Sequence, residues 1–132
     1  MTASIARPEL ARALRTGLAR LQGATGVDCA MGGLVERGGT RLVITELHRM
    51  RTNAFRGTVV TPGAGAGGQA WRLARPVAVD DYLRSAMITH HYDQQAQTEQ
   101  ANGTFAVPVR VGPHIGGLIW GLVRTPQPLG DR

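Results

Sequence analysis

Apolar residues recur at helical spacing near the start of the chain. Four leucines lie at intervals of four, four and three residues: Leu10, Leu14, Leu18 and Leu21. Because residues three and four apart share one face of a helix, this pattern predicts an amphipathic helix with one buried stripe. Pro8 suits the first turn of such a helix, and Gly23 is expected to end it.

Apolar runs rich in β-branched residues predict two hairpins. The runs at 27–36 and 40–47 flank a short Gly-rich turn, and the runs at 104–111 and 114–124 flank the pair 112–113. Strands joined by such short turns pair antiparallel. The first and the last pair of strands therefore predict an antiparallel sheet.

Glycine and proline mark irregular positions inside these strands. Gly32 and Gly33 interrupt the first run, which indicates a bulge or a close approach of another backbone. Pro108 has no N–H to donate, so its strand is expected to lie at an edge or to carry a bulge there.

Shorter elements are expected between the hairpins. The pattern predicts strands at 57–61 and 77–81 and helices at 66–75 and about 92–101. Residues 48–57 show no clear periodicity and are expected to form a loop or a short irregular helix. Helices that alternate with antiparallel hairpins predict the α+β class and not a parallel α/β sheet.

Gly63, Gly65 and Gly68 have the spacing of a dinucleotide-binding turn. The helix that follows is too short for a parallel crossover, and Asp80 and Asp81 lie closer than the roughly 20 residues expected for a ribose ligand. We therefore expect these glycines to adopt positive φ and to turn a strand into a short helix packed close to the sheet.

Composition narrows the class of protein. A length of 132 residues predicts one domain spanning residues 1–132. The net charge is +6, but the arginines are spread along the chain and aromatic residues make up 5%, which does not favour direct binding of nucleic acid. With one cysteine, no signal-peptide pattern and no long apolar run, a soluble cytoplasmic protein without a membrane segment is expected.

Three stretches resemble the second half of a GAF domain: PGAGAGGQAWRLARPVAVDDY, ITHHYD and FAVPVRVGPHIGGLIWGLVR. The predicted first helix and first hairpin are similar to the start of that family, so the resemblance extends from about Pro8 to Arg124. It is nearest to GAF domains that precede helix-turn-helix segments in bacterial transcriptional regulators.

The resemblance implies a GAF-like (PAS-like) antiparallel sheet with helices on one face and a cap of loops and short helices on the other. The cap would enclose a pocket for a small-molecule effector, an unidentified organic compound of anionic or aromatic character. Such domains commonly form homodimers, and contact with DNA would occur only through an output domain absent from this chain.

Candidate ligand-binding residues lie in and beside the expected cap: Arg49, Trp71, Tyr82, His90 and Tyr92. Arg49 belongs to an Arg-rich loop that would suit a carboxylate or a phosphate. A structural alternative for the segment around His90 is that Thr89 caps the following helix and Asp93 favours its N-terminus. Trp120 is expected in the core.

Catalytic and cofactor chemistry find little support. Cys29 is expected to be a small buried hydrophobe, no carboxylate pair has a recognisable catalytic spacing, and no metal ligand set or cofactor is expected. The leading hypothesis is thus a non-enzymatic sensory domain. The alternatives are a ligand-free dimerisation module and a haem or metal redox sensor. Such a sensor would use the cluster His90, His91, Asp93 and Glu99 and would recruit His48 or His114 from elsewhere in the chain.

Overall fold

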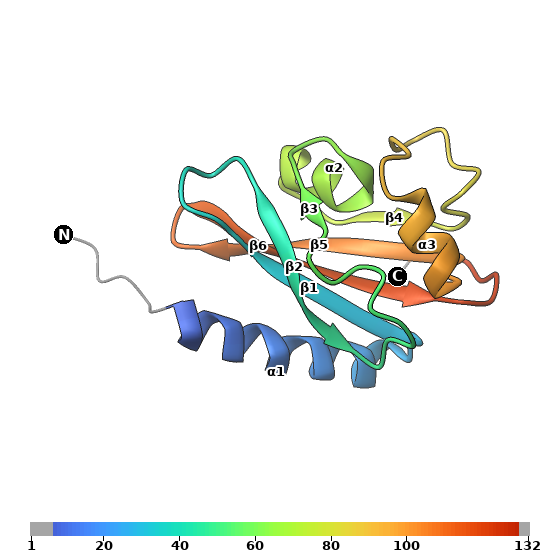
Figure 1. Ribbon diagram of the computed structural model, residues 1–132, viewed down its shortest axis with the longest axis horizontal. Coiled ribbons are helices and arrows are strands. Elements are labelled where there is room, and N and C mark those ends of the chain that lie inside the picture. The colour runs from blue at the N-terminus through green and yellow to red at the C-terminus, as the bar shows by residue number, and fades with distance from the viewer. Residues whose placement is uncertain (1–6, 130–132) are drawn as a thin grey trace.

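The computed structural model describes residues 7–129 of the chain (Figure 1). The helices are α1 (Arg7–Thr25), α2 (Gly65–Leu73) and α3 (Asp93–Glu99). The strands are β1 (Cys29–Val35), β2 (Leu42–His48), β3 (Val59–Val60), β4 (Val77–Val79), β5 (Gly103–Val111) and β6 (His114–Val123).

The strands form one six-stranded antiparallel sheet in the order β3-β2-β1-β6-β5-β4. The pairing of β1 with β6 at the centre joins the first hairpin to the last. Helix α1 lies alone on one face of the sheet, and α2, α3 and their connecting loops form a cap on the other (Figure 1). This arrangement confirms the expected α+β class with a capped sheet.

Helix α1 continues past its expected end. Leu14 and Leu18 are buried against the sheet, as their spacing predicts. Gly23 does not stop the helix, because nothing at this exposed position requires a non-helical conformation. The helix ends instead at Thr25, and the Gly26 that follows has a φ of 72° and donates its N–H to the Gln22 carbonyl at 2.9 Å.

The irregular strand positions are confirmed. The register between β1 and β2 shifts between Gly32 and Gly33, so β2 carries a bulge opposite these glycines. Pro108 pairs with Leu118 of β6 but lies beyond Ala106, the last residue of β5 that pairs with β4. Pro108 therefore occupies an edge position of the sheet.

The elements between the hairpins are present but shorter than expected, and residues 49–57 form a series of turns without a helix. Helices α2 and α3 both end at a residue in the left-handed conformation, Ala74 with φ 54° and Gln100 with φ 60°. No helix within residues 7–129 is long and apolar enough to cross a membrane.

The Gly-rich turn before α2 brings this helix close to the sheet. Gly63 and Gly65 have φ of 89° and 63°, which confirms the expected use of positive φ. Gly67 lies directly under the ring of Trp120, and an added Cβ there would lie 2.1 Å from Trp120 Cζ2. The glycines thus allow the turn and the contact between α2 and the indole ring.

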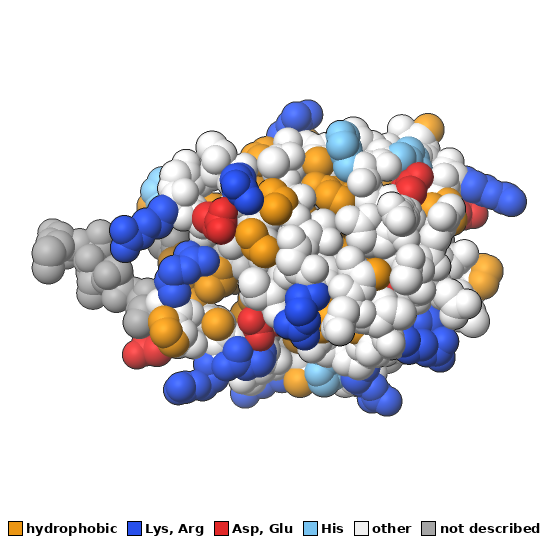
Figure 2. All heavy atoms as spheres, viewed as in Figure 1, with side chains coloured by type: hydrophobic (Ala, Val, Ile, Leu, Met, Phe, Trp, Pro, Cys, Tyr) orange, Lys and Arg blue, Asp and Glu red, His pale blue; other side chains and the backbone are white. Residues whose placement is uncertain are grey.

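The main apolar core lies between the sheet and the cap. Leu118, Trp120 and Leu122 project from β6 into this core, and Cys29 and Met31 join them from β1. A smaller cluster contains Val27, Val123 and Leu129, with Leu21 of α1 packed against it. On the face shown in Figure 2, arginine side chains are scattered over the surface and along its rim and do not gather in one patch.

The contact between Gly67 and Trp120 predicts that Gly67→Ala destabilises the protein. The added methyl group would overlap the indole ring, and overpacking of this kind costs about 1–3 kcal/mol. Urea denaturation measures the change in the free energy of unfolding. Gly23→Ala is the control, because its Cβ meets nothing within 4 Å and alanine favours a helix by about 1 kcal/mol over glycine. Equal effects of both substitutions would contradict the packing argument.

Candidate functional site

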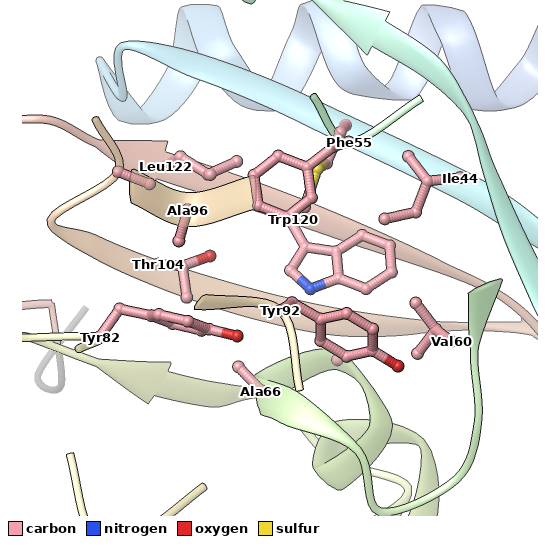
Figure 3. A pocket seen from close by; sticks show the side chains of 13 residues that line it. Ile44, Phe55, Val60, Ala66, Tyr82, Tyr92, Ala96, Thr104, Trp120 and Leu122 are labelled. Atoms are coloured by element: carbon pink, nitrogen blue, oxygen red, sulfur yellow. The ribbon is translucent and has the colours of Figure 1, made fainter. Parts of the chain in front are cut away.

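A narrow pocket lies between the sheet and the cap (Figure 3). Strands β1, β2, β3, β5 and β6 contribute lining residues from the sheet, and α2, α3 and the loops contribute them from the cap. The lining residues are Met31, Ile44, Phe55, Val60, Ala66, Gly67, Tyr82, Tyr92, Ala96, Ala101, Thr104, Trp120 and Leu122. The free volume is about 20 Å³, enough for one water molecule.

Four polar groups interrupt this apolar lining. The Thr104 hydroxyl donates to the Gly121 carbonyl at 2.9 Å, and the Tyr92 hydroxyl donates to the Val59 carbonyl at 3.0 Å. Tyr82 and Trp120 are 6% and 5% exposed, yet within residues 7–129 neither the Tyr82 hydroxyl nor the Trp120 indole N–H has a hydrogen-bond partner. Two hydrogen-bond donors are therefore available at the pocket.

The tyrosine hydroxyls remain neutral at ordinary pH. Burial raises the pKa of Tyr82, and the nearby negative charge of Asp93 raises it further. Burial also raises the pKa of Tyr92. Both phenols therefore act at the pocket as uncharged groups that can donate or accept one hydrogen bond.

Of the residues expected to bind a ligand, Tyr82 and Tyr92 line the pocket together. Trp71 packs against the outside of the main core and does not line the pocket. Arg49 also lies outside the lining, and its guanidinium donates to Gln22 Oε1 of α1 at 3.5 Å. Ligand contact by any of these residues stays a prediction.

His90 does not line the pocket but holds the loop beside it. Its Nδ1 lies 2.8 Å from Asp93 Oδ1 and its Nε2 lies 2.7 Å from the Ser85 carbonyl oxygen. Both partners accept hydrogen bonds, so this geometry suits the protonated ring, and the Asp93 and Ser85 contacts raise the pKa of His90. The His90 ring stands edge-on to Tyr82 with centroids 6.2 Å apart.

Thr89 does not cap α3 as expected. Helix α3 begins after Tyr92 without a side-chain cap, and the Thr89 hydroxyl instead accepts the N–H of Gly65 at 2.8 Å, at the start of α2. The same hydroxyl lies 2.7 Å from His91 Nδ1. Thr89 thus ties the loop before α3 to the Gly-rich turn, because the fold brings these two segments together.

Glu99 takes part in a different cluster from the histidines. Its side chain is buried and accepts hydrogen bonds from the N–H of Arg51 at 2.8 Å and from the N–H and hydroxyl of Thr52 at 3.0 and 2.6 Å. Arg124 donates to the same carboxylate through its guanidinium. We call Arg51, Thr52, Glu99 and Arg124 the Glu99 cluster, and it joins the loop 49–57, the end of α3 and the segment after β6.

The Glu99 cluster keeps its carboxylate ionised. Burial alone acts to raise the pKa of Glu99, but the hydrogen bonds from Thr52, Arg51 and Arg124 together outweigh burial and lower the pKa below its usual value. The Arg124 Nε–H also donates to the Glu99 carbonyl at 3.2 Å, and the Arg124 N–H donates to Asp28 Oδ2 at 2.7 Å.

The part of the chain that the structure describes contains no group of residues arranged for metal binding or thiol catalysis. Within residues 7–129 no group of three His, Cys, Asp or Glu side chains is placed to hold a metal ion. Cys29 is buried, and burial raises the pKa of its thiol to about 11. The thiolate, which is the reactive form, is therefore scarce at neutral pH.

Sequence reasoning missed part of the pocket. Phe55 lies in a stretch without periodicity, so nothing in the local pattern indicated that it turns inward. Trp120 was expected in the core, and its alternation with Leu118 and Leu122 correctly indicates the buried face of β6. That this face also lines a pocket depends on the cap, which packs from distant segments.

Comparison with known proteins finds one similar regulatory protein in sequence and several similar folds. No protein-family model matches the chain. The HTH-type transcriptional activator RamA of Corynebacterium glutamicum is 38% identical over 119 residues, which are 90% of this chain and 42% of RamA. The chain therefore spans less than half the length of this relative.

Solved structures share the fold at low sequence identity. A mutated NreA from Staphylococcus aureus, altered in its nitrate binding site, superposes with a TM-score of 0.73 at 14% identity and covers 96% of both chains. The second GAF domain of DevS from Mycobacterium smegmatis superposes with a TM-score of 0.66 at 18% identity, and the match covers 86% of this chain and 72% of the DevS chain. Free methionine-R-sulfoxide reductase from Neisseria meningitidis superposes with a TM-score of 0.69 at 19% identity, and the match covers 89% of this chain and 65% of the reductase chain.

The Glu99 cluster predicts a large loss of stability in Glu99→Gln. The substitution leaves the Arg124 guanidinium buried without its counter-charge, and breaking a buried ion pair in this way costs about 3 kcal/mol or more. Glu36→Gln is the control, because its ion pair with Arg41 spans 3.6 Å at the surface and contributes less than about 1 kcal/mol. Chemical denaturation at neutral pH compares the two; similar losses would contradict a structural role for Glu99.

The same cluster predicts acid sensitivity. Because the pKa of Glu99 is lower in the folded chain than in the unfolded one, its stabilising effect is present above the unfolded value of about 4.3 and is lost as pH falls through the folded value. The midpoint temperature of thermal unfolding should therefore fall more steeply between pH 6 and pH 3 for the natural protein than for Glu99→Gln. Parallel curves would show that Glu99 does not contribute to this slope.

The His90 contacts predict that Asp93→Asn lowers the pKa of His90. The pKa of His90 lies above its ordinary value in the folded chain. The contact with Asp93 therefore stabilises the fold fully below about pH 6.5, and this stabilisation is lost as pH rises through the pKa of His90 in the folded chain. NMR titration of the imidazole signals measures the change. Asp81→Asn, which removes only an exposed contact with Arg84, should leave the His90 titration unchanged. An unchanged titration in Asp93→Asn would show that the contact is absent in solution.

Proposed function

We propose that this chain, which has the GAF fold, is the signal-input domain of a cytoplasmic bacterial transcription regulator and binds a small molecule in the pocket described above. The observation that carries the ligand-binding part is the pair of donors on the largely buried side chains of Tyr82 and Trp120, which line the pocket and have no hydrogen-bond partner within residues 7–129. The regulatory part is supported by the similarity of 90% of the chain to an HTH-type transcriptional activator. Contact with DNA would belong to a segment outside this chain.

The proposed mechanism is a shift between two arrangements of the cap. The pocket has room for one water molecule, so a larger ligand has to displace part of the cap. Phe55 and Ala96 lie on the two cap segments that meet in the Glu99 cluster, the loop 49–57 and α3. A ligand that favours the displaced arrangement would therefore act on Arg124, where the chain leaves the sheet, and from there on an output segment or a homodimer partner.

A non-enzymatic role accords with the site. The fold also occurs in free methionine-R-sulfoxide reductase, so the fold by itself does not decide the question. The chain contains one cysteine, and burial of Cys29 raises the pKa of its thiol to about 11. A thiol of this kind is a poor nucleophile and has no second cysteine in the chain to resolve an oxidised form.

A second candidate function is a ligand-free module that pairs two chains. The small free volume of about 20 Å³ favours this alternative, because a pocket filled by its own side chains needs no ligand to be stable. The two candidates differ in what they expect of the Tyr82 and Trp120 donors. Ligand sensing requires a polar partner from outside the chain, whereas pairing requires at most one ordered water.

Native mass spectrometry of the purified protein separates these candidates. Ligand sensing predicts added mass, either retained on purification or acquired from a metabolite extract, that leaves on denaturation. Ala96→Leu places a larger side chain at the pocket and should abolish the added mass, whereas Ala24→Leu on the exposed side of α1 should keep it. Circular dichroism checks that both variants fold, and Ala101→Val at the same pocket replaces Ala96→Leu if the latter does not.

A dimer without added mass under all conditions would favour the pairing module. Added mass that survives both Ala96→Leu and Ala101→Val would place the ligand elsewhere on the chain and contradict the proposed site.

A further inference from the structure

We infer that the pocket selects an uncharged molecule that presents a hydrogen-bond acceptor to Trp120 Nε1–H and the Tyr82 hydroxyl. This inference rests on the proposed function and specifies the chemical class of the ligand. It departs from the anionic ligand that the Arg-rich loop around Arg49 led us to expect, because Arg49 does not reach the pocket.

The two donors define the polar part of the ligand. In Figure 3 the indole nitrogen of Trp120 and the hydroxyl of Tyr82 point into the same part of the pocket, beside Ala66 and Tyr92. An indole N–H can only donate, so its partner has to be an acceptor. A carbonyl or similar oxygen on the ligand would give this N–H a hydrogen-bond partner that residues 7–129 do not supply.

The remaining polar groups of the lining are already engaged. Thr104 and Tyr92 donate their hydroxyl protons to backbone carbonyls, so they offer only lone pairs to a ligand. All other lining side chains are apolar, and Gly67 exposes only backbone. The ligand is therefore expected to combine one acceptor group with an apolar body.

The charges around the pocket disfavour an anion. No arginine and no histidine is among the lining residues, so an anion would lose its hydration without gaining a counter-charge. Asp93, whose charge acts on the Tyr82 hydroxyl, adds negative potential on that side. A cation would meet the aromatic faces favourably, but the indole N–H of Trp120, which can only donate, presents its positive end to the pocket and opposes it.

Four benzene derivatives of similar shape test the inference on the purified chain: benzamide, benzoate, benzylammonium and toluene. Benzamide is uncharged with an acceptor, benzoate and benzylammonium carry opposite charges, and toluene lacks an acceptor. The indole N–H signals in proton–nitrogen correlation spectra report binding directly, and the chain has two tryptophans. Trp120→Phe assigns the Trp120 signal, and the Trp71 signal, from outside the pocket, is the internal reference.

The expected result is that benzamide shifts the Trp120 indole signal, leaves that of Trp71 in place, and binds at least about tenfold more tightly than each of the other three probes. Tyr82→Phe should weaken the binding of benzamide about fivefold and leave the binding of toluene unchanged, because the substitution removes only the hydroxyl group. If Tyr82→Phe does not fold, the comparison of the four probes on the natural protein still tests whether the pocket selects an uncharged acceptor.

Binding of benzoate or benzylammonium as tight as that of benzamide would overturn the inferred class and leave the sensory function standing. Equal binding of toluene would show that the two donors do not select the ligand and would also overturn it. If no probe shifts the Trp120 signal up to its solubility limit, the inference is overturned, and the proposed function is then judged separately by the added mass in native mass spectrometry.

Discussion

The buried carboxylate of Glu99 is the contact on which the placement of the cap depends. An ionised carboxylate removed from water costs several kcal/mol unless its oxygens are fully bonded, and here two backbone N–H groups, the Thr52 hydroxyl and the Arg124 guanidinium bond it. These partners come from a loop after β2 and from the segment after β6. The loop 49–57 and α3 therefore hold fixed positions over the sheet although their backbones make few regular hydrogen bonds to it.

The pocket is a consequence of how closely this cap approaches the sheet. Gly67 lets α2 lie against the ring of Trp120, and the hydroxyl of Thr89 holds the start of α2 to the loop before α3. The close approach leaves about 20 Å³ free, and two donors of the lining, on Tyr82 and Trp120, have no hydrogen-bond partner within residues 7–129. A small ligand with an acceptor group would gain from binding here, because it would supply hydrogen bonds that residues 7–129 do not make to these two donors.

Much of the fold could be predicted from local pattern. The leucine stripe of α1, both hairpins, the bulge at Gly32 and Gly33 and the edge position of Pro108 all follow from side-chain periodicity and from backbone restrictions of single residues. The wrong predictions concern helix ends and caps. Helix α1 continues through Gly23, and the Thr89 hydroxyl accepts a hydrogen bond from the start of α2 instead of capping α3. For the candidate site, Trp71 and Tyr82 were expected beside a cavity because they flank the cap, and of these two only Tyr82 lines the pocket, whereas Phe55 has no local signal.

The sequence by itself determined the class, order and pairing direction of the elements, since helical and strand periodicity and short turns are properties of neighbouring residues. Only the tertiary structure decided which side chains meet. It separated Glu99 from His90 and His91 and paired it with Arg124, moved Arg49 away from the pocket, and brought the donors of Tyr82 and Trp120 together. The physical reason is that these contacts join segments far apart in the chain, and their geometry depends on the packing of the whole cap against the sheet and not on any local pattern.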